Sequence, residues 1–493
     1  MKNIKLFFCS LIATCMLISC ADLETVNLNN ADIDKALGNP NEWEAIIQGQ
    51  FNPLWHATQL WRSGAAFTMG TVADAVTSSW GNFGMRDMSS EPRIRINNSE
   101  TYTYAYFIEY PYYNFFSVIG TVNDILKKIA EDPSVAPQDA NGEVITGKLQ
   151  SVGHFLQGAA FGNLALMYDK AQFADETSDP LTAPELPFDD YNTLMDKALG
   201  KLDQAVSEAQ AAPDFTVGYW NGLSLTKEEF IAVIRTMQAR FVAYKSRTPA
   251  ENDSNDWGRV MSFARQGIQS DFVVTGDGNL WWDAYKYYGS EPIWSRADYR
   301  VMQALASNIP GRFPEDGSHP FPIHAPEDVI DQRIDTDFTY AETIFFRANR
   351  GLYHFSHYHH TRYFDHYPGA TGPMPHILKA ENDLLIAEAL VRTGGDRAEA
   401  AALINATRVD RGGLPALDGS ESDADMITAI LHERYVELML TAGGLPFFDR
   451  RRVADDDGSF APYSGLQPGT FRQMPIPAKE LNVLEEEIYT FGG

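Results

Sequence analysis

Cysteine is scarce in this 493-residue chain, and its three cysteines all lie within the first twenty residues. A disulfide framework or a cysteine-ligated zinc cluster is therefore excluded for the rest of the chain, and the apolar core alone must hold the fold. The residues for a core are present, because 44% of the chain is hydrophobic and 12% is aromatic. A chain of this length and composition buries well over half of its unfolded surface.

Basic residues are also few, and no obvious boundary divides the chain. The formal net charge is −27 at pH 7, which makes nucleic acid a poor partner. The sequence has no block of five like charges that would predict a tail, and no Gly/Ser-rich or Pro-rich linker. We therefore expect one large domain over residues 20–493.

The first twenty residues have the features of a secretory signal. Two lysines precede an apolar run at residues 6–18, which is too short to span a bilayer. Residues 17–19 before Cys20 resemble the bacterial lipobox, in which the peptidase cuts before a cysteine that carries lipid. The sequence predicts a signal peptide at residues 1–19 and a lipid-modified Cys20. An ordinary signal peptide with a chance cysteine is the alternative.

Helical periodicity dominates the remaining sequence. The clearest case is "ENDLLIAEALVRTGGDRAEAAALINATRVDRGGLP", residues 381–415, in which apolar residues follow one face of each of two helices. Gly394 and Gly395 permit the turn between these helices, and Asp396 can cap the second one. We predict a mainly α fold, with tetratricopeptide-like helix pairs as the scaffold, loop-rich insertions and few short strands. Similar pairs are expected at residues 147–170 with 189–212 and at residues 226–246 with 255–269.

Five segments together resemble the SusD/RagB family of Bacteroidetes outer-membrane lipoproteins, over nearly the whole chain. They are the residues before Cys20, the helix pair at 381–415, "DQR" at 331–333, "HERYVELML…FFDRRR" at 432–452 and "QMPIPAKEL" at 473–481. The segment "TAGGLP" departs from the family pattern, because it is longer than usual before the "FD" pair and lacks an arginine.

The resemblance implies a binding protein and not an enzyme, with no cofactor. Such a protein is lipid-anchored in the outer membrane and faces the cell exterior. It binds oligosaccharide or polysaccharide and delivers it to a SusC-like TonB-dependent transporter. A ligand such as a peptide or another nutrient is the alternative within the same architecture.

A lipid-anchored glycan hydrolase is the less favoured alternative. Glu433 and Glu437 lie one turn apart on a predicted helix at residues 426–440, whereas glycosidase carboxylates lie about 5 to 9.5 Å apart across a sugar ring. We interpret them as part of a structural ion cluster, with Arg434 and the arginines at 450–452 as counterions. The sequence contains no nucleophile elbow, P-loop or HExxH motif, so we expect no catalytic residue.

Histidines are concentrated in one segment. "YHFSHYHHTRYFDHYPGATGPMPH" holds six of the eleven histidines between His354 and His376. His354 and His357, or His357 and His359, are the candidates for a metal site, but a local run says little about convergence of ligands on one ion. We therefore expect packed, hydrogen-bonding histidines and no metal.

Two segments without sustained periodicity are predicted to bind the ligand. "WWDAYKYYGSEPIW", residues 281–294, mixes six aromatic rings with charged residues, which suits a sugar that stacks on a ring and bonds through its hydroxyls. Part of this segment is expected at the surface. "ADAVTSSWGNFGMRD", residues 73–87, is the second, and a packed tryptophan with ordinary surface polar residues is its alternative. The rings of "TYTYAYFIEYPYYNFF", residues 101–116, are assigned mostly to the core. The predicted ligand-binding residues are Asp74, Trp80, Asn82, Arg86, Trp282, Tyr285, Tyr288 and Trp294.

Overall fold

The structure is a computed structural model of the chain. It describes residues 37–60, 65–77, 84–179, 182, 185–293, 295–312, 328–342, 354–363, 365, 368–441 and 443–493. The predicted signal peptide, Cys20, Trp80, Asn82 and Trp294 lie outside the described residues. Among the helices that are described, none combines the length and the apolar character needed to cross a membrane.

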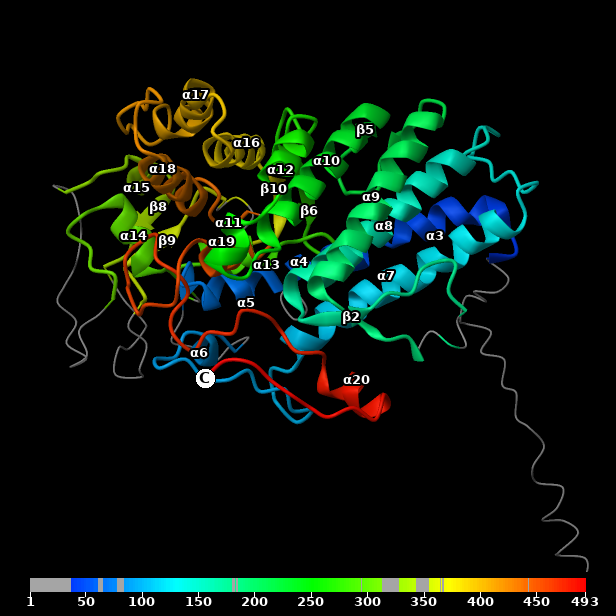
Figure 1. Ribbon diagram of the computed structural model, residues 1–493, viewed down its shortest axis with the longest axis horizontal. Helices are drawn as coiled ribbons and strands as arrows, with labels where there is room; N and C mark the ends of the chain where they lie inside the picture. Colours follow the sequence, from blue (N-terminus) through cyan, green and yellow to red (C-terminus); the bar gives the residue numbers. More distant parts are fainter. Residues whose placement is uncertain are drawn as a thin grey trace, which may run out of the picture.

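The fold is mainly helical with few short strands, and all three expected helix pairs are present. The pairs follow one another across the molecule, and Figure 1 shows them along its upper edge. The pairs are α8 (Thr146–Met167) with α9 (Tyr191–Ala211), α10 (Lys227–Tyr244) with α12 (Trp257–Ala264), and α16 (Lys379–Thr393) with α17 (Arg397–Arg408).

The turn between α16 and α17 has the predicted chemistry. Gly394 ends α16 with a φ of 66°, a left-handed conformation that glycine adopts without steric cost. The side chain of Asp396 then accepts hydrogen bonds from the backbone N–H groups of Ala398 and Glu399 at the start of α17. Local sequence therefore determines both the length of this turn and the antiparallel arrangement of the pair.

The other helices pack around these pairs, and most of them are short. The long helix α7 lies against α8 and α4. The remaining helices are α3 (Trp43–Gly49), α4 (Phe51–Gln59), α5 (Ala65–Val72), α6 (Met85–Met88), α7 (Tyr106–Glu131), α11 (Pro249–Asp253), α13 (Ala284–Ser290), α14 (Tyr299–Leu305), α15 (Arg333–Thr336), α18 (Asp423–Val436), α19 (Leu445–Val453), α20 (Ala478–Val483) and the 3₁₀ helix η1 (Pro40–Glu42).

The strands form two-stranded antiparallel sheets that join distant parts of the chain. The longest pairing, between β6 and β10, brings together segments about a hundred residues apart in the sequence. The described sheets are β1 (Val76–Thr77) with β7 (Arg296–Ala297), β2 (Lys170–Gln172) with β3 (Phe188–Asp190), β4 (Thr216–Val217) with β5 (Leu225–Thr226), β6 (Phe272–Asp277) with β10 (Thr371–Ile377), and β8 (Phe338–Tyr340) with β9 (Tyr358–His360).

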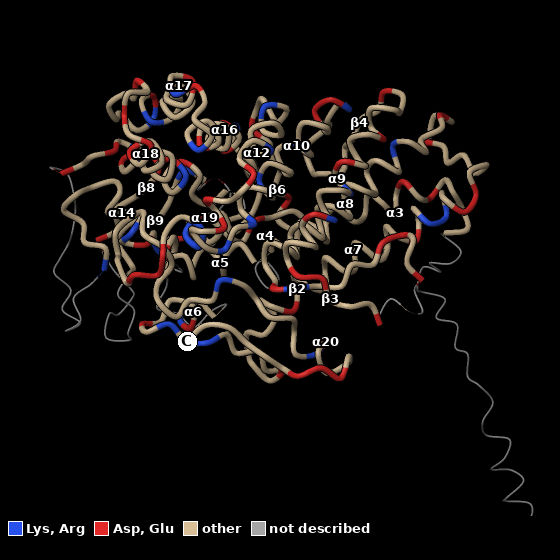
Figure 2. The backbone as a smooth tube through the Cα atoms, viewed as in Figure 1, with Lys and Arg blue, Asp and Glu red and all other residues tan. Residues whose placement is uncertain are grey.

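Two apolar clusters form the core. The larger one includes side chains from α7, α8, α9, α10, α12 and α16, and the smaller one includes side chains from α5, α13, α14 and the end of α18. Charged residues of both signs are distributed along the outer helices, and Figure 2 shows an acidic stretch after α20 at residues 485–487. The smaller cluster supports the segments that were predicted to bind the ligand.

A buried ion cluster joins the helix pairs to α18 and α19. Glu388 on α16 accepts two hydrogen bonds of 2.8 Å from Arg452 and pairs with Arg434. Arg452 also bonds Asp449 at 2.6 Å. All four side chains are at most 1% exposed, so removal of one partner would leave an unpaired charge in the core.

The structural interpretation of Glu433 and Glu437 is supported, but the predicted counterions are wrong. Arg333 donates to Glu433 at 2.7 and 3.0 Å, and it also reaches Glu437 at 3.2 Å. Arg362 and Arg411 also form ion pairs with Glu437, at 2.8 and 2.7 Å. The sequence assigned this role to Arg434 and residues 450–452, which lie on the same or the next helix, whereas long-range packing supplies the actual partners.

Candidate functional site

The pairing of β1 with β7 brings the two predicted ligand-binding segments together. Val76 pairs with Ala297 and Thr77 with Arg296, in antiparallel register. The segment at 73–87 therefore lies beside residues 296–297, just after the segment at 281–294, although about two hundred residues separate the two segments in the sequence. This convergence was not readable from either segment alone.

The aromatic segment at 281–294 is partly helical, which corrects the expectation of an irregular loop. Asp283 caps α13 by accepting the backbone N–H of Lys286 at 3.0 Å. Tyr285 and Gly289, four residues apart, turn inward, toward Gly70 and Leu440 respectively. The helical spacing leaves Tyr287 and Tyr288 half-buried on the other side of α13.

Trp282, Tyr287 and Tyr288 form a continuous row of touching rings, here called the ring row. The ring centroids of Trp282 and Tyr287 lie 5.7 Å apart, and those of Tyr287 and Tyr288 lie 5.1 Å apart. Tyr288 rests on the buried Phe67 at 5.7 Å. Trp282 and Tyr288 were predicted, and Tyr287 was missed because the i, i+4 spacing of Tyr285 and Gly289 was not recognised as helical.

The backbone before the ring row is fixed to α4. Trp55 donates its indole N–H to the carbonyl of Trp282 at 2.9 Å. Asn52 and His56 bond the carbonyl of Leu280 at 2.9 and 2.8 Å. These contacts use backbone carbonyls, so a substitution of the Trp282 side chain leaves the hydrogen bonds to α4 in place.

The buried Lys286 anchors α13 to the chain after α18. Its ammonium group donates to Asp283 at 3.0 Å and to the carbonyl of Leu440 at 2.7 Å. Burial lowers the pKa of Lys286, and the neighbouring Asp283 carboxylate opposes this shift. The helix that carries Tyr287 and Tyr288 is therefore tied to the chain just after α18.

Asp74 and Tyr285 do not face solvent, which corrects their assignment as ligand contacts. Asp74 is fully buried, with Arg300 at 2.9 Å and Arg93 as its ion-pair partners. Tyr285 is 1% exposed and packs against Gly70. Both residues support the site from within, whereas Arg86 on α6 is exposed.

One histidine of the histidine-rich segment, His354, lies close to two carboxylates, in the arrangement of a metal site. Asp74, Asp298 and His354 place ligand atoms within 4.8 Å of one another, and no other group of this kind occurs among the described residues. Two guanidinium groups already neutralise Asp74, so an added dication would lie beside like charges. His357 and His359 are not members of this cluster. The donor set does not favour a metal.

A second set of partly exposed rings starts before α7, where the sequence assigned most rings to the core. Tyr102, Tyr104, Tyr106 and Tyr110 touch in succession, with centroids 5.6, 6.1 and 6.1 Å apart. Tyr102 donates its hydroxyl to Asp87 on α6 at 2.6 Å, next to Arg86. Most rings of the segment belong to the core or pack on it: Phe107, Tyr112 and Phe115 are buried, and the partly buried rings packed against the larger cluster are Tyr102, Tyr104, Tyr106, Tyr113 and Phe116.

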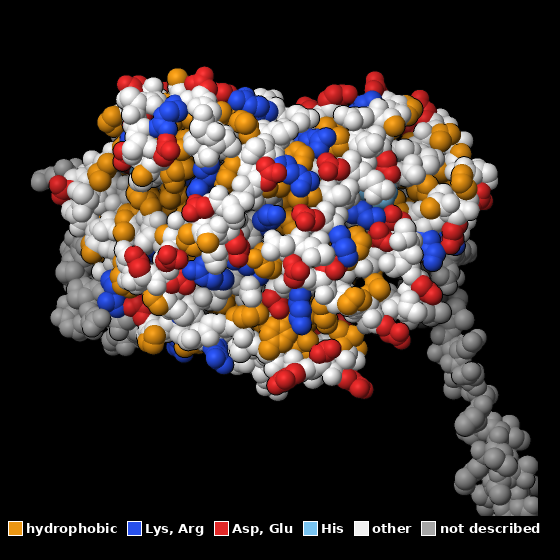
Figure 3. Space-filling view, in the orientation of Figure 1, with side chains coloured by type: hydrophobic (Ala, Val, Ile, Leu, Met, Phe, Trp, Pro, Cys, Tyr) orange, Lys and Arg blue, Asp and Glu red, His pale blue; other side chains and the backbone are white. Residues whose placement is uncertain are grey.

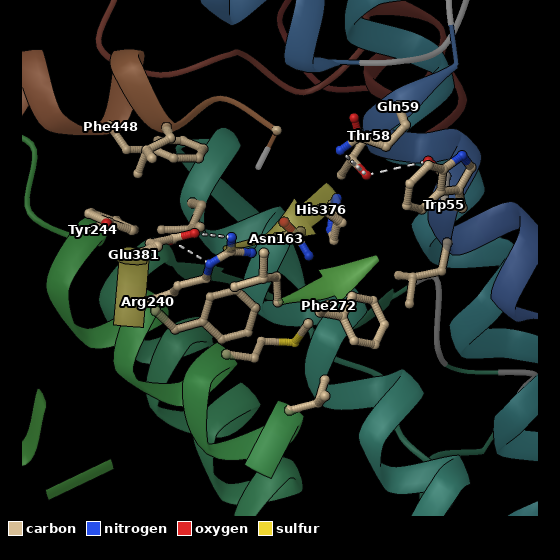
Figure 4. A pocket seen from close by; sticks show the side chains of 18 of the residues that line it. Trp55, Thr58, Gln59, Asn163, Arg240, Tyr244, Phe272, His376, Glu381 and Phe448 are labelled. Atoms are coloured by element: carbon tan, nitrogen blue, oxygen red, sulfur yellow. Dashed lines mark hydrogen bonds and ion pairs between the residues drawn. The ribbon is translucent and has the colours of Figure 1, made fainter. Parts of the chain in front are cut away.

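A cavity lies at the centre of the molecule, where several helices meet the β6–β10 sheet (Figure 4). Trp55 lines it and also bonds the backbone of the ring row. Arg240 and Glu381 form a bidentate pair at its edge, with one bond of 2.6 Å. The labelled side chains around it are Trp55, Thr58, Gln59, Asn163, Arg240, Tyr244, Phe272, His376, Glu381 and Phe448.

The size of this cavity decides against it as an oligosaccharide site. The cavity volume is about 80 Å³. Ligand sites usually enclose about 300 to 1,000 Å³, so this cavity is too small for a sugar chain. An oligosaccharide therefore fits the outer ring row and not this cavity.

Two buried histidines beside the ring row predict acid sensitivity. Burial, with the charge of Arg296, lowers the pKa of His359 to about 4, and burial lowers the pKa of His360 well below its usual value. The unfolded chain takes up these protons near pH 6.5, so the free energy of unfolding should fall as the pH falls from 6.5 to 5. Each histidine contributes up to about 1.4 kcal/mol per pH unit.

Urea unfolding of the His359→Gln variant at pH 7, 6 and 5 checks this expectation. The variant should lose less stability toward pH 5 than the unchanged protein. His154→Gln is the matched control: burial alone would lower the pKa of His154, but hydrogen bonds to Glu176 and Glu208 raise it. The stability that His154 contributes is fully present below pH 6.5 and is lost only as the pH rises. An acid dependence that is equal in all three proteins would contradict the account.

Comparisons with known proteins agree with this architecture. The SusD family model matches residues 243–483. A SusD homolog from Bacteroides thetaiotaomicron has a TM-score of 0.63 and 14% identity, with 94% of this chain and 99% of that chain covered. No curated protein sequence matches the chain.

Two further solved structures share the fold. A SusD superfamily protein from Parabacteroides distasonis has a TM-score of 0.62 and 11% identity, covering 90% of this chain and 97% of that one. A SusD-like carbohydrate binding protein from Bacteroides fragilis has a TM-score of 0.57 and 14% identity, covering 84% and 86%. At these identities the structural likeness concerns the fold.

Proposed function

We propose, from the premise that this chain is a SusD-like protein, that it binds oligosaccharides or polysaccharides through the ring row. The observation that carries the proposal is the row itself: three touching, half-buried rings mounted on a fixed backbone. A sugar ring stacks its C–H face on such a surface, and polar groups nearby set its orientation. Trp80, Asn82 and Trp294, which the sequence predicted, and the exposed Arg86 remain part of this proposed site.

Carbohydrate is favoured over peptide because one solved structure of this fold is a carbohydrate binding protein. Binding is favoured over hydrolysis because the best carboxylate pair is already engaged. Glu433 and Glu437 share the guanidinium of Arg333 and are at most 2% exposed, so neither is placed to protonate or attack a sugar. A peptide or other nutrient remains the alternative ligand.

The lipobox before Cys20 extends the proposal to location and partner. A lipid-modified Cys20 would hold the protein on the outer membrane, facing the cell exterior. From there the protein would pass its ligand to a SusC-like TonB-dependent transporter. The family resemblance supports this partner. The formal net charge of −27 argues against nucleic acid as a partner.

Replacement of Trp282 by Ala should weaken glycan binding about tenfold or more and leave the thermal melt close to that of the unchanged protein. The indole is half-buried, and its own backbone carbonyl keeps the bond from Trp55. Affinity gels containing soluble starch, xylan, arabinogalactan or galactomannan identify the ligand, and calorimetry measures the loss.

Tyr285→Ala is the matched control from the same segment. Because Tyr285 is buried, this change should cost about 3 to 5 kcal/mol of stability and affect binding only through folding. A Trp282→Ala variant that melts early and binds normally would refute the ring row as the ligand surface.

Cys20→Ala should release the protein from the membrane. Each buried methylene contributes about 0.8 kcal/mol, and stable anchoring needs more than one acyl chain, which a lipoprotein cysteine carries. The variant should move to the soluble or unprocessed fraction of the bacterium. Retention in the membrane after a carbonate wash would show that Cys20 is not the anchor.

The protein should copurify with a large β-barrel transporter after gentle detergent extraction. Mass spectrometry of the crosslinked and purified complex identifies the partner. Recovery of the chain only as a free monomer, even after crosslinking, would speak against the transporter complex and leave the glycan proposal in place.

A further inference from the structure

A second hollow lies between α14, α17 and α18, away from the ring row. Its volume is about 430 Å³, which is in the usual range for small-ligand sites. Figure 3 shows apolar side chains gathered on this side of the molecule, below α17. Ile330, which is 48% exposed, and Pro462 line the hollow, so part of its wall is apolar and open to solvent.

The wall of the hollow includes one aromatic side chain, Tyr463. Tyr463 is half-buried and stacks on Tyr435, with centroids 6.2 Å apart and ring planes at 19°. Tyr435 is 4% exposed and covers one face of Tyr463. The His432 ring also packs on Tyr463, with centroids 6.0 Å apart. Tyr463 lines the hollow and Tyr435 does not, so a part of the Tyr463 side chain that these neighbours leave uncovered borders the hollow.

A chain of hydrogen bonds fixes the hydroxyl of Tyr463. Its oxygen lies 2.6 Å from Nδ1 of His432, and Nε2 of His432 lies 2.7 Å from a carboxylate oxygen of Asp331. Arg333 holds the same carboxylate at 2.6 Å. Asp331 and Arg333 form the ends of the "DQR" motif, and His432 begins "HERYVELML", so both motifs converge on this tyrosine.

The direction of these bonds follows from the charges. Burial alone would raise the pKa of Asp331, but the bonds from His432 and Arg333 lower it, so the carboxylate is ionised and only accepts. His432 Nε2 therefore carries a hydrogen. Burial raises the pKa of Tyr463, and the charge of Asp331 adds to the shift, so its hydroxyl stays protonated. The oxygen of Tyr463 keeps lone pairs that can accept from a ligand.

Polar side chains line the same hollow as Tyr463. Arg408 is held through Nε to the carbonyl of Pro415 at 2.9 Å, and within the described part of the chain its two terminal amino groups have no protein partner. Asp425 and Thr428 lie one turn apart on α18, and both are exposed.

We infer that this hollow is a second carbohydrate site, in which one or two sugar units stack on Tyr463 and bond to Arg408 and Thr428. The inference rests on the proposed function for the ligand class and adds a separate place for it. A half-buried aromatic ring with a fixed hydroxyl, beside a guanidinium that keeps terminal N–H donors, suits a sugar, because a sugar ring has an apolar face and a polar edge. A polysaccharide that reaches both sites would be held more tightly than a trisaccharide, which occupies one.

Native mass spectrometry of the mature protein counts the sites. The probe is the trisaccharide of whichever polysaccharide retards the protein in the affinity gels, for example maltotriose for starch or xylotriose for xylan. The unchanged protein should bind two trisaccharides, and Trp282→Ala and Tyr463→Ala should each bind one. The double variant should bind none, and Tyr463→Phe, which keeps the ring, should bind more tightly than Tyr463→Ala.

Arg408→Gln provides a test that leaves the Tyr463–His432–Asp331 chain in place, in case Tyr463→Ala fails to fold. It should weaken the second binding event about tenfold and leave the first unchanged. One trisaccharide on the unchanged protein, or two on Tyr463→Ala together with an unweakened second binding event on Arg408→Gln, would overturn the second site while the ring row stands. Absence of retardation in every gel would instead refute the proposed function itself.

Discussion

The buried ion cluster around Glu388 is the interaction on which the arrangement of the site depends. It links α16 of the helix pairs to α18 and α19 through Arg434 and Arg452. The chain that leaves α18 carries Leu440, whose carbonyl accepts from Lys286 under α13. The scaffold of helix pairs thus positions the ring row through three buried cations, Arg434, Arg452 and Lys286. Replacing such a cluster with apolar residues need not cost stability, but breaking one pair within it would cost about 3 to 5 kcal/mol.

The aromatic rings of the ring row and Tyr463 suit ligand binding because the protein holds them in place. The ring row is tied to α4 by bonds to backbone carbonyls, and Tyr463 is tied to Asp331 through His432. In both places the side chain that would contact a sugar loses little conformational freedom on binding, because the protein has already fixed it. The central cavity differs from both, because its volume of about 80 Å³ is below the usual range for ligand sites.

The sequence predicted those parts of the structure that local chemistry determines. The α16–α17 turn followed from Gly394 and Asp396, because a left-handed glycine and a cap act within a few residues. Helix α13 was missed, since seven residues contain too few turns to show periodicity among six aromatic rings. Asp74 was placed on the surface because its neighbours lack a pattern, whereas it is buried and pairs with Arg93 and with the distant Arg300. Long-range pairing of that kind leaves no mark on a short segment.

The most direct test of the account is a crystal structure of the mature protein with a hexasaccharide of the glycan that it binds. The account predicts a sugar ring within about 4 Å of the face of Trp282, Tyr287 or Tyr288, with these rings in the positions described here. A hexasaccharide bound elsewhere, with the ring row open to solvent, would contradict it.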